Sequence, residues 1–142
     1  MVEFGLLTLS QVPDGQRPWV FIVDDDPAVR DAVKYLVQSF GWNVEAFDSA
    51  EAFLGAYTPE RRGCLVLDLH MPNMNGVELQ RRLAAQNIHI PVIVVTAHQD
   101  DPLVAQAKRA GALSILAKPF KDRDLACGIV QALAGLDNPP SQ

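Results

Sequence analysis

The sequence predicts an α/β fold in which a five-stranded, doubly wound parallel sheet is covered by five helices. Five short apolar runs alternate along the chain with five stretches whose apolar residues recur at helical spacing. Apolar runs without polar alternation are typical of strands that are buried on both faces, and short loops between alternating elements favour right-handed crossovers. Together these observations predict two helical layers with a parallel sheet between them.

The first strand is predicted at Trp19–Val23, where the run WVFIV is wholly apolar. Asp26 is a plausible N-cap and Pro27 suits the first helical position, so a helix begins here and ends at Gly41. Its inward positions are expected to be Val29, Ala32, Val33, Leu36, Val37 and Phe40.

The second strand is predicted at Trp42–Phe47. Ser49 can cap a second helix, which runs to about Tyr57 and is terminated by Pro59. The pattern then repeats three more times. The remaining strands are expected at Cys64–Asp68, Pro91–Thr96 and Leu113–Ala117, and the remaining helices at Gly76–Asn87, from Asp101-Pro102 to Gly111, and at Asp122–Ala134.

The expected domain organisation is one domain at residues 19–134. Residues 1–18 contain two prolines and little periodicity, so we expect an N-terminal extension that is partly disordered. Residues 135–142 (GLDNPPSQ) resemble a tail or the start of a linker. At 142 residues and 49% apolar content, the chain is long enough to bury one core.

The net charge of −5 and a pI near 5.0 disfavour direct nucleic-acid binding by this chain, because no basic stripe is visible. Cys64 and Cys127 have neither close pairing nor metal-type spacing, so we expect reduced thiols. We expect no association with a membrane, because no stretch is long enough to cross one. The N-terminus lacks a signal-peptide pattern, which predicts a cytoplasmic location.

Polar residues collect where the predicted strands end. The first strand runs into three aspartates at 24–26, the third ends in Asp68, the fourth in Thr96, and the fifth runs into Lys118. Two carboxylates about 4 Å apart repel by roughly 4 kcal/mol at an effective dielectric near 20, so this cluster needs a cation. Carboxylate and carbonyl oxygens are the ligands that Mg²⁺ accepts, and Mg²⁺ would also neutralise an incoming phosphoryl group.

Asp68 is the candidate nucleophile, because aspartyl-phosphate is a known type of covalent intermediate. Lys118 and Thr96 would each contact a phosphoryl oxygen. Singly, a Lys before a Pro is more often a surface residue, and a Thr at a strand end more often caps a turn. Their combination at successive strand ends favours the functional interpretation.

These residues also carry a resemblance to a known family. The segments VDDD (23–26), LDLHMPNMNG (67–76), VVTA (94–97) and KPF (118–120) resemble the receiver domains of bacterial response regulators in two-component systems. The similarity covers about residues 19–134. Two further segments, SAEAFL (49–54) and GVELQRRL (76–83), are most similar to FixJ-type receivers.

The resemblance implies a flavodoxin-like (CheY-like) sheet with strand order 2-1-3-4-5. It implies that Mg²⁺ is held by Asp25, Asp68 and the backbone carbonyl of His70, with Asp24 acting through water. Thr96 would turn inward to the phosphoryl group, and Lys118 would bridge to it, with a cis bond to Pro119.

The resemblance also implies the partners. A sensor histidine kinase would donate the phosphoryl group to Asp68, and the protein would catalyse its own phosphorylation and autodephosphorylation without being a conventional enzyme. Phosphorylation would change the surface formed by the fourth helix, fifth strand and fifth helix, with homodimerisation through that face as one outcome. Output would be control of transcription through a helix-turn-helix domain that these 142 residues do not contain.

Two features depart from the family pattern or add to it. Many members carry an aromatic residue three positions before the lysine, where this chain has Ile115, so coupling through an aromatic rotamer is not expected here. His70 and His98 follow Asp68 and Thr96 by two residues; they are either ordinary loop residues or groups that affect the lifetime of the aspartyl-phosphate.

Two alternatives stay open at this point. A pseudo-receiver would act as a constitutive interaction module, although all the expected site residues are present. A Mg²⁺-dependent phosphohydrolase would use the same nucleophile. Such enzymes usually have a second acidic residue two positions after the nucleophile, which protonates the leaving group, whereas this chain has His70 at that position.

Overall fold

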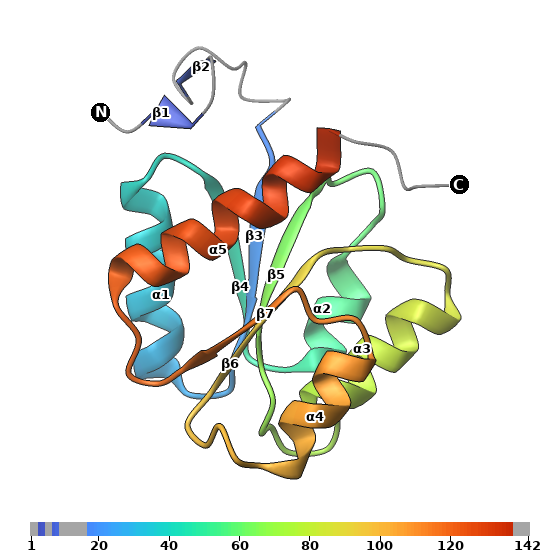
Figure 1. Cartoon of the computed structure of the whole chain (residues 1–142). Helices are drawn as coiled ribbons and strands as arrows, with labels where there is room; N and C mark the ends of the chain where they lie inside the picture. Colours follow the sequence, from blue (N-terminus) through green and yellow to red (C-terminus); the bar gives the residue numbers. More distant parts are fainter. Residues whose placement is uncertain (1–2, 5–6, 9–16, 138–142) are drawn as a thin grey trace.

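The computed structural model describes residues 3–4, 7–8 and 17–137. A five-stranded parallel sheet with strand order β4-β3-β5-β6-β7 forms its centre (Figure 1). In chain order this is 2-1-3-4-5, which confirms the predicted topology. The elements are β3 (Trp19–Val23), α1 (Pro27–Ser39), β4 (Asn43–Phe47), α2 (Ala50–Ala56), β5 (Gly63–Asp68), α3 (Gly76–Ala85), β6 (Val92–Thr96), α4 (Pro102–Arg109), β7 (Ser114–Ala117) and α5 (Asp122–Ala134).

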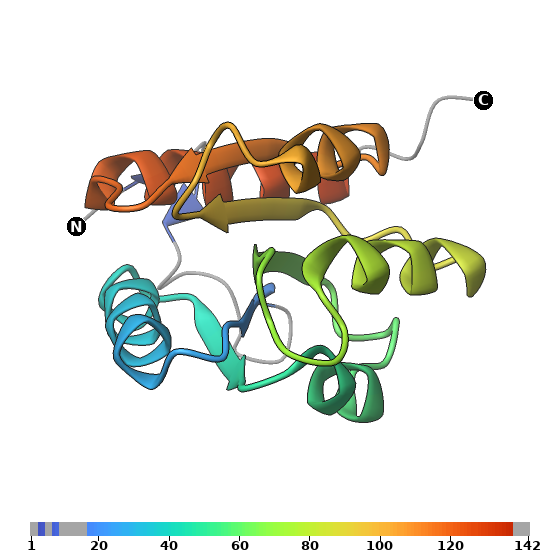
Figure 2. The ribbon, with the colours of Figure 1, turned by 90° about the horizontal axis from the view of Figure 1, so that it is seen from below.

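Successive residues of the strands supply two separate cores, one on each face of the sheet. Phe21 and Val23 of β3 pack with residues of α2, α3 and α4, whereas Val20 and Ile22 pack with residues of α1 and α5. This alternation follows from the two-residue period of a strand. Figure 2 shows α1 and α5 on one side of the sheet and α2, α3 and α4 on the other.

The predicted helix starts are confirmed by their caps. Asp26 accepts a hydrogen bond from the N–H of Ala28, and Ser49 accepts one from Ala52. Asp101 likewise accepts from Leu103. The start of α3 is a capping box that was not predicted from the sequence: Asn75 and Glu78 each accept a hydrogen bond from the other's backbone N–H.

Several predicted boundaries and one predicted core position need correction. The strands expected to start at Trp42, Cys64, Pro91 and Leu113 start instead at Asn43, Gly63, Val92 and Ser114. The helix expected to reach Asn87 ends at Ala85, and Asn87 itself has φ of 60°, which an α-helix does not accommodate. Ala32 was expected to face inward, but it is exposed. In α1 only Val33 and Val37 are fully buried, because the helix packs on the sheet through a narrow stripe.

The chain outside the central domain is only partly described. Glu3–Phe4 (β1) and Leu7–Thr8 (β2) form an antiparallel pair, and a 3-10 turn at Gly135–Asp137 follows α5. The expectations of partial disorder in residues 1–18 and of a tail at 135–142 otherwise fall outside the described residues. Among the described helices, none has the length and apolar character needed to span a membrane.

Candidate functional site

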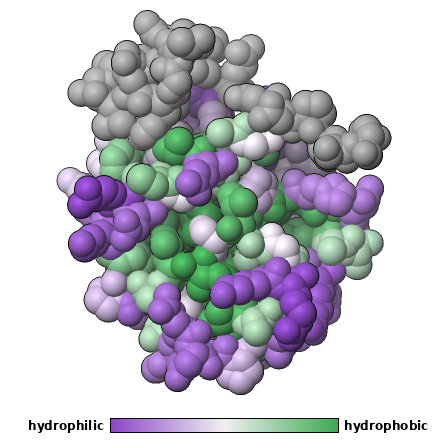
Figure 3. All heavy atoms as spheres, viewed as in Figure 1, coloured by the Kyte–Doolittle hydropathy of each residue, from purple (hydrophilic) through white to green (hydrophobic). Residues whose placement is uncertain are grey.

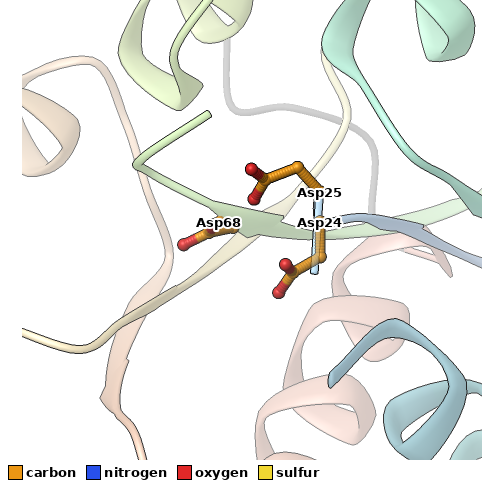
Figure 4. A group of neighbouring side chains, drawn as sticks. All are labelled: Asp24, Asp25 and Asp68. Carbon is orange, nitrogen blue, oxygen red and sulfur yellow. The ribbon is translucent and has the colours of Figure 1, made fainter. Parts of the chain in front are cut away.

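Five predicted site residues meet at the carboxyl edge of the sheet. Asp24 and Asp25 directly follow β3, Asp68 ends β5, Thr96 ends β6 and Lys118 follows β7. β3, β5, β6 and β7 are consecutive neighbours in the sheet, so their ends lie side by side. Figure 4 shows the three aspartates gathered at the ends of β3 and β5.

The carboxylates of Asp24, Asp25 and Asp68 form the acidic centre of this edge. One oxygen from each lies within 4.8 Å of the others. Asp24 and Asp68 are buried, with 2% and 6% of their surface exposed, while Asp25 is exposed. This donor set fits Mg²⁺, which takes carboxylate oxygens and keeps several waters, because the exposed side of Asp25 leaves access to solvent.

Among the described residues, the ammonium of Lys118 is the cation that contacts the buried carboxylates of Asp24 and Asp68. Its Nζ lies 3.2 Å from Oδ2 of Asp24 and 3.6 Å from Oδ1 of Asp68. The backbone N–H of Lys118 donates to the carbonyl of Thr96 at 2.7 Å, and the peptide bond to Pro119 is cis, as expected. Lys118 is thus fixed by its backbone as well as by its charge.

Asp68 has a perturbed acidity. Burial, followed by the nearby charge of Asp24, raises the pKa of Asp68 from 3.8 to about 6, although Lys118 and a hydrogen bond from the backbone of His70 oppose the rise. The carboxylate is therefore mostly ionised above pH 7, which is the form that can act as a nucleophile.

Thr96 is fully buried, and its hydroxyl is engaged within its own loop. It donates to the carbonyl of His98 at 3.3 Å and accepts from the N–H of the same residue at 3.2 Å. Among the described residues, none of its hydrogen bonds goes to Asp68. In this structure Thr96 is turned to the β6–α4 loop rather than toward the acidic centre.

The loop after β5 is held close to the nucleophile by a glycine. The N–H of Gly76 donates to the carbonyl of Leu69 at 3.0 Å. A Cβ at Gly76 would lie 2.7 Å from the backbone oxygen of Asp68, so a larger residue would displace this backbone. Asn73 has φ of 71°, a left-handed conformation that Asn tolerates, and Met71 and Met74 are buried beside it.

Some site contacts were not predicted from the sequence. Arg30 donates to the backbone carbonyl of Asp24 at 2.9 Å. These two residues are six positions apart, which is not a spacing at which helical side chains pair, so the sequence carried no signal for this contact. His70, whose carbonyl is the expected metal ligand, has an exposed imidazole that lies 2.6 Å from the carboxylate of Asp101. These two residues are 31 positions apart, and no local pattern pairs them.

Ile115 lies on β7 and is half-buried at the edge of the core that α2, α3 and α4 cover. It also lines a hollow between α4 and β7, together with Gln99, Val104, Lys108, Ala112, Leu113 and Ser114. The position that is aromatic in many receivers is therefore filled by an aliphatic side chain that packs in place.

Comparison with known proteins gives one consistent family. A family model described as "Response regulator receiver domain" matches residues 20–129. The transcriptional regulatory protein FixJ of Bradyrhizobium diazoefficiens is 40% identical over 114 residues, which are 80% of this chain and 56% of that protein. Response regulator protein TmoT of Ectopseudomonas mendocina is 43% identical over 118 residues, 83% of this chain and 54% of TmoT.

Solved structures agree with this result. The response regulator StyR superposes with a TM-score of 0.79 at 47% identity, covering 83% of this chain and 60% of that one. A crystal structure of FixJ-N gives a TM-score of 0.78 at 41% identity and covers 89% of this chain and 99% of that one. The chain spans about half the length of the curated relatives that it matches.

Proposed function

The chain belongs to the response regulator receiver domain family, and from this premise we propose that Asp68 accepts a phosphoryl group from a sensor histidine kinase in a Mg²⁺-dependent reaction. The observation that carries the proposal is the position of Asp68. It is a buried carboxylate with Lys118 at 3.6 Å and two further carboxylates within 4.8 Å.

In the proposed reaction an oxygen of Asp68 attacks the phosphorus of a phosphohistidine. The new oxygen–phosphorus bond forms as the phosphorus–nitrogen bond breaks, and the electron pair of that bond returns to the imidazole of the kinase. Lys118 stands where its ammonium can approach a phosphoryl oxygen, and the Thr96 hydroxyl can reach another once it leaves His98.

The metal would be held by Asp25, Asp68 and the backbone carbonyl of His70, with Asp24 acting through water. When bound, Mg²⁺ supplies neutralisation of the charge on the transferring group. Asp24 is already paired with Lys118 and accepts a hydrogen bond from the N–H of Asp26, so it is oriented before any metal arrives.

We also propose that the output is a change in the face formed by α4, β7 and α5, through which two phosphorylated copies associate. Figure 3 shows apolar residues gathered on the side of the molecule that carries these elements. Leu113 is 51% exposed and borders the hollow between α4 and β7. FixJ, to which this chain is similar, is a transcriptional regulatory protein, which supports transcriptional control as the final output.

The first experiment is to incubate the protein with Mg²⁺ and acetyl phosphate and to measure its intact mass. We expect one phosphoryl adduct that is lost in base, is absent from Asp68→Asn and is retained in Asp31→Asn, an exposed aspartate on α1. A protein that binds Mg²⁺ but forms no adduct with acetyl phosphate or with a phosphorylated kinase would instead be a pseudo-receiver. Steady turnover of a small phosphoester would favour the phosphohydrolase.

The association face is tested with Leu113→Asp. Its light-scattering mass after phosphorylation should stay monomeric at concentrations at which the phosphorylated wild type is dimeric, because a charge at this position would have to lose its water on association. An unchanged phosphorylation-dependent mass in Leu113→Asp would place the contact elsewhere.

A further inference from the structure

A side-chain contact joins two loops at the site that are separate in sequence. His70 lies in the loop after β5, two residues beyond Asp68, and Asp101 lies directly before α4. The Nε2 of His70 is 2.6 Å from Oδ2 of Asp101. In Figure 1 the β5–α3 and β6–α4 loops lie next to each other at the lower end of the sheet.

Asp101 uses its two carboxylate oxygens for different segments. Oδ1 accepts the N–H of Leu103 at 2.7 Å and so caps α4, while Oδ2 contacts His70. The N–H of Leu103 and the side chain of His70 both lower the pKa of the Asp101 carboxyl. The start of α4 is thus tied, through one carboxylate, to the loop that follows the proposed nucleophile.

The segment between Thr96 and Asp101 is restrained at both ends. At its beginning, the Thr96 hydroxyl is bonded to the backbone of His98. At its end, the N–H of Asp101 donates to the carbonyl of His98 at 3.2 Å, and Asp101 is held by His70. Thr96 can give its hydroxyl to another acceptor only if it releases the His98 carbonyl, and turning its side chain away also breaks the hydrogen bond that it accepts from the His98 N–H.

We propose that the His70–Asp101 pair is a latch that holds the β6–α4 segment in the arrangement in which Thr96 faces His98. This role rests on the proposed phosphoacceptor function, and it makes His70 and Asp101 positioning residues that do not themselves touch the phosphoryl group. A contact made only in one of two arrangements shifts the population toward that arrangement.

Breaking the latch therefore lowers the cost of turning Thr96 toward Asp68. The pair is partly exposed, with 51% of the His70 side chain open to solvent. Partly exposed polar contacts between side chains shift equilibria by up to about fivefold, so the expected effect is a roughly two- to fivefold change.

The test is a double-mutant cycle of His70→Ala, Asp101→Ser and both together. Ser retains an N-cap acceptor for α4 but is too short to reach His70. Two quantities are measured: the amide hydrogen exchange of the first turn of α4 in the unphosphorylated protein without Mg²⁺, and the rate of adduct formation with acetyl phosphate and Mg²⁺. We expect each single variant to speed both about two- to fivefold, and the double variant to add nothing further.

His89→Ala is the matched control, since His89 lies in the α3–β6 loop at the other end of the sheet and contacts Asn87. It should leave both quantities unchanged. Unchanged α4 exchange in His70→Ala, or additive effects in the double variant, would overturn the latch. Faster exchange without faster phosphorylation would overturn its link to the site. A wild type that forms no adduct would refute the proposed function, while the exchange data would still decide whether the latch exists.

Discussion

The Lys118 ammonium lies 3.2 Å from the Asp24 carboxylate, closer than the 3.6 Å that separates it from Asp68. Lys118 is therefore the internal counter-ion of two buried carboxylates. Its ammonium lies closer to Asp24 than to Asp68, which is the proposed nucleophile. The Asp68 carboxylate thus has a weaker partner, which agrees with its raised pKa.

Replacing Lys118 by Met should destabilise the metal-free protein. The buried carboxylates of Asp24 and Asp68 would lose their cation, which we expect to cost roughly 2 kcal/mol, less than for a fully buried pair because Lys118 is partly exposed. Urea unfolding in EDTA measures this loss, and Mg²⁺ should restore part of it. Lys121→Met, an exposed lysine three residues later, is the control; equal stabilities of the two variants would contradict the counter-ion role.

Mg²⁺ should stabilise the folded protein through the aspartate cluster. At ten times its dissociation constant, a ligand that binds only the folded state adds about 1.4 kcal/mol to the free energy of unfolding. Asp25→Asn should raise the dissociation constant for Mg²⁺ at least about tenfold, because it removes a charged oxygen ligand. Thermal unfolding across a Mg²⁺ titration measures the affinity. Glu60→Gln, a fully exposed acid outside the cluster, should behave as the wild type does.

The acidity of Asp68 predicts a specific pH dependence. The folded-state pKa of about 6 lies above the ordinary value of 3.8, so the folded protein holds this proton more tightly. The resulting stability is fully present below about pH 4 and is lost as the pH rises through 6. The shift corresponds to an upper limit of about 3 kcal/mol, and solvent access reduces it to roughly 1–2 kcal/mol.

Asp68→Asn removes this titration, because an amide has no proton to lose. In EDTA, the variant should become more stable than the wild type as the pH rises from 4 to 7.5. The measurement is the difference between their urea unfolding free energies at each pH, which cancels the titration of carboxylates that do not interact with Asp68. A difference that does not vary with pH would show that Asp68 titrates normally.

Two glycines provide a test of the loop after β5. Gly76→Ala would place a Cβ 2.7 Å from the backbone oxygen of Asp68, and we expect a loss of about 1–3 kcal/mol from this overpacking together with weaker Mg²⁺ binding. Gly55→Ala in α2 meets no atom within 4 Å and should stabilise the helix by about 0.5–1 kcal/mol. Chemical denaturation of both variants, with and without Mg²⁺, separates the two outcomes. Equal effects of the two substitutions would mean that the loop can move aside.

Much of the fold could be predicted because its signals are local. The caps at Asp26, Ser49 and Asp101 act on backbone groups two or three residues away, and strand burial follows from short apolar runs. The helix end at Ala85 and the exposure of Ala32 were predicted wrongly. Both depend on how a helix packs on the sheet, and periodicity alone leaves one or two positions undecided.

The sequence by itself determined the alternation of strands and helices and the residue types at the strand ends, and the resemblance added the strand order. Tertiary structure alone decided which of these groups touch. Lys118 contacts Asp24 across 94 residues, and His70 contacts Asp101 across 31. Such pairings depend on where packing places two loops relative to each other, whereas a cap or an apolar stripe is fixed by interactions within a single turn or strand.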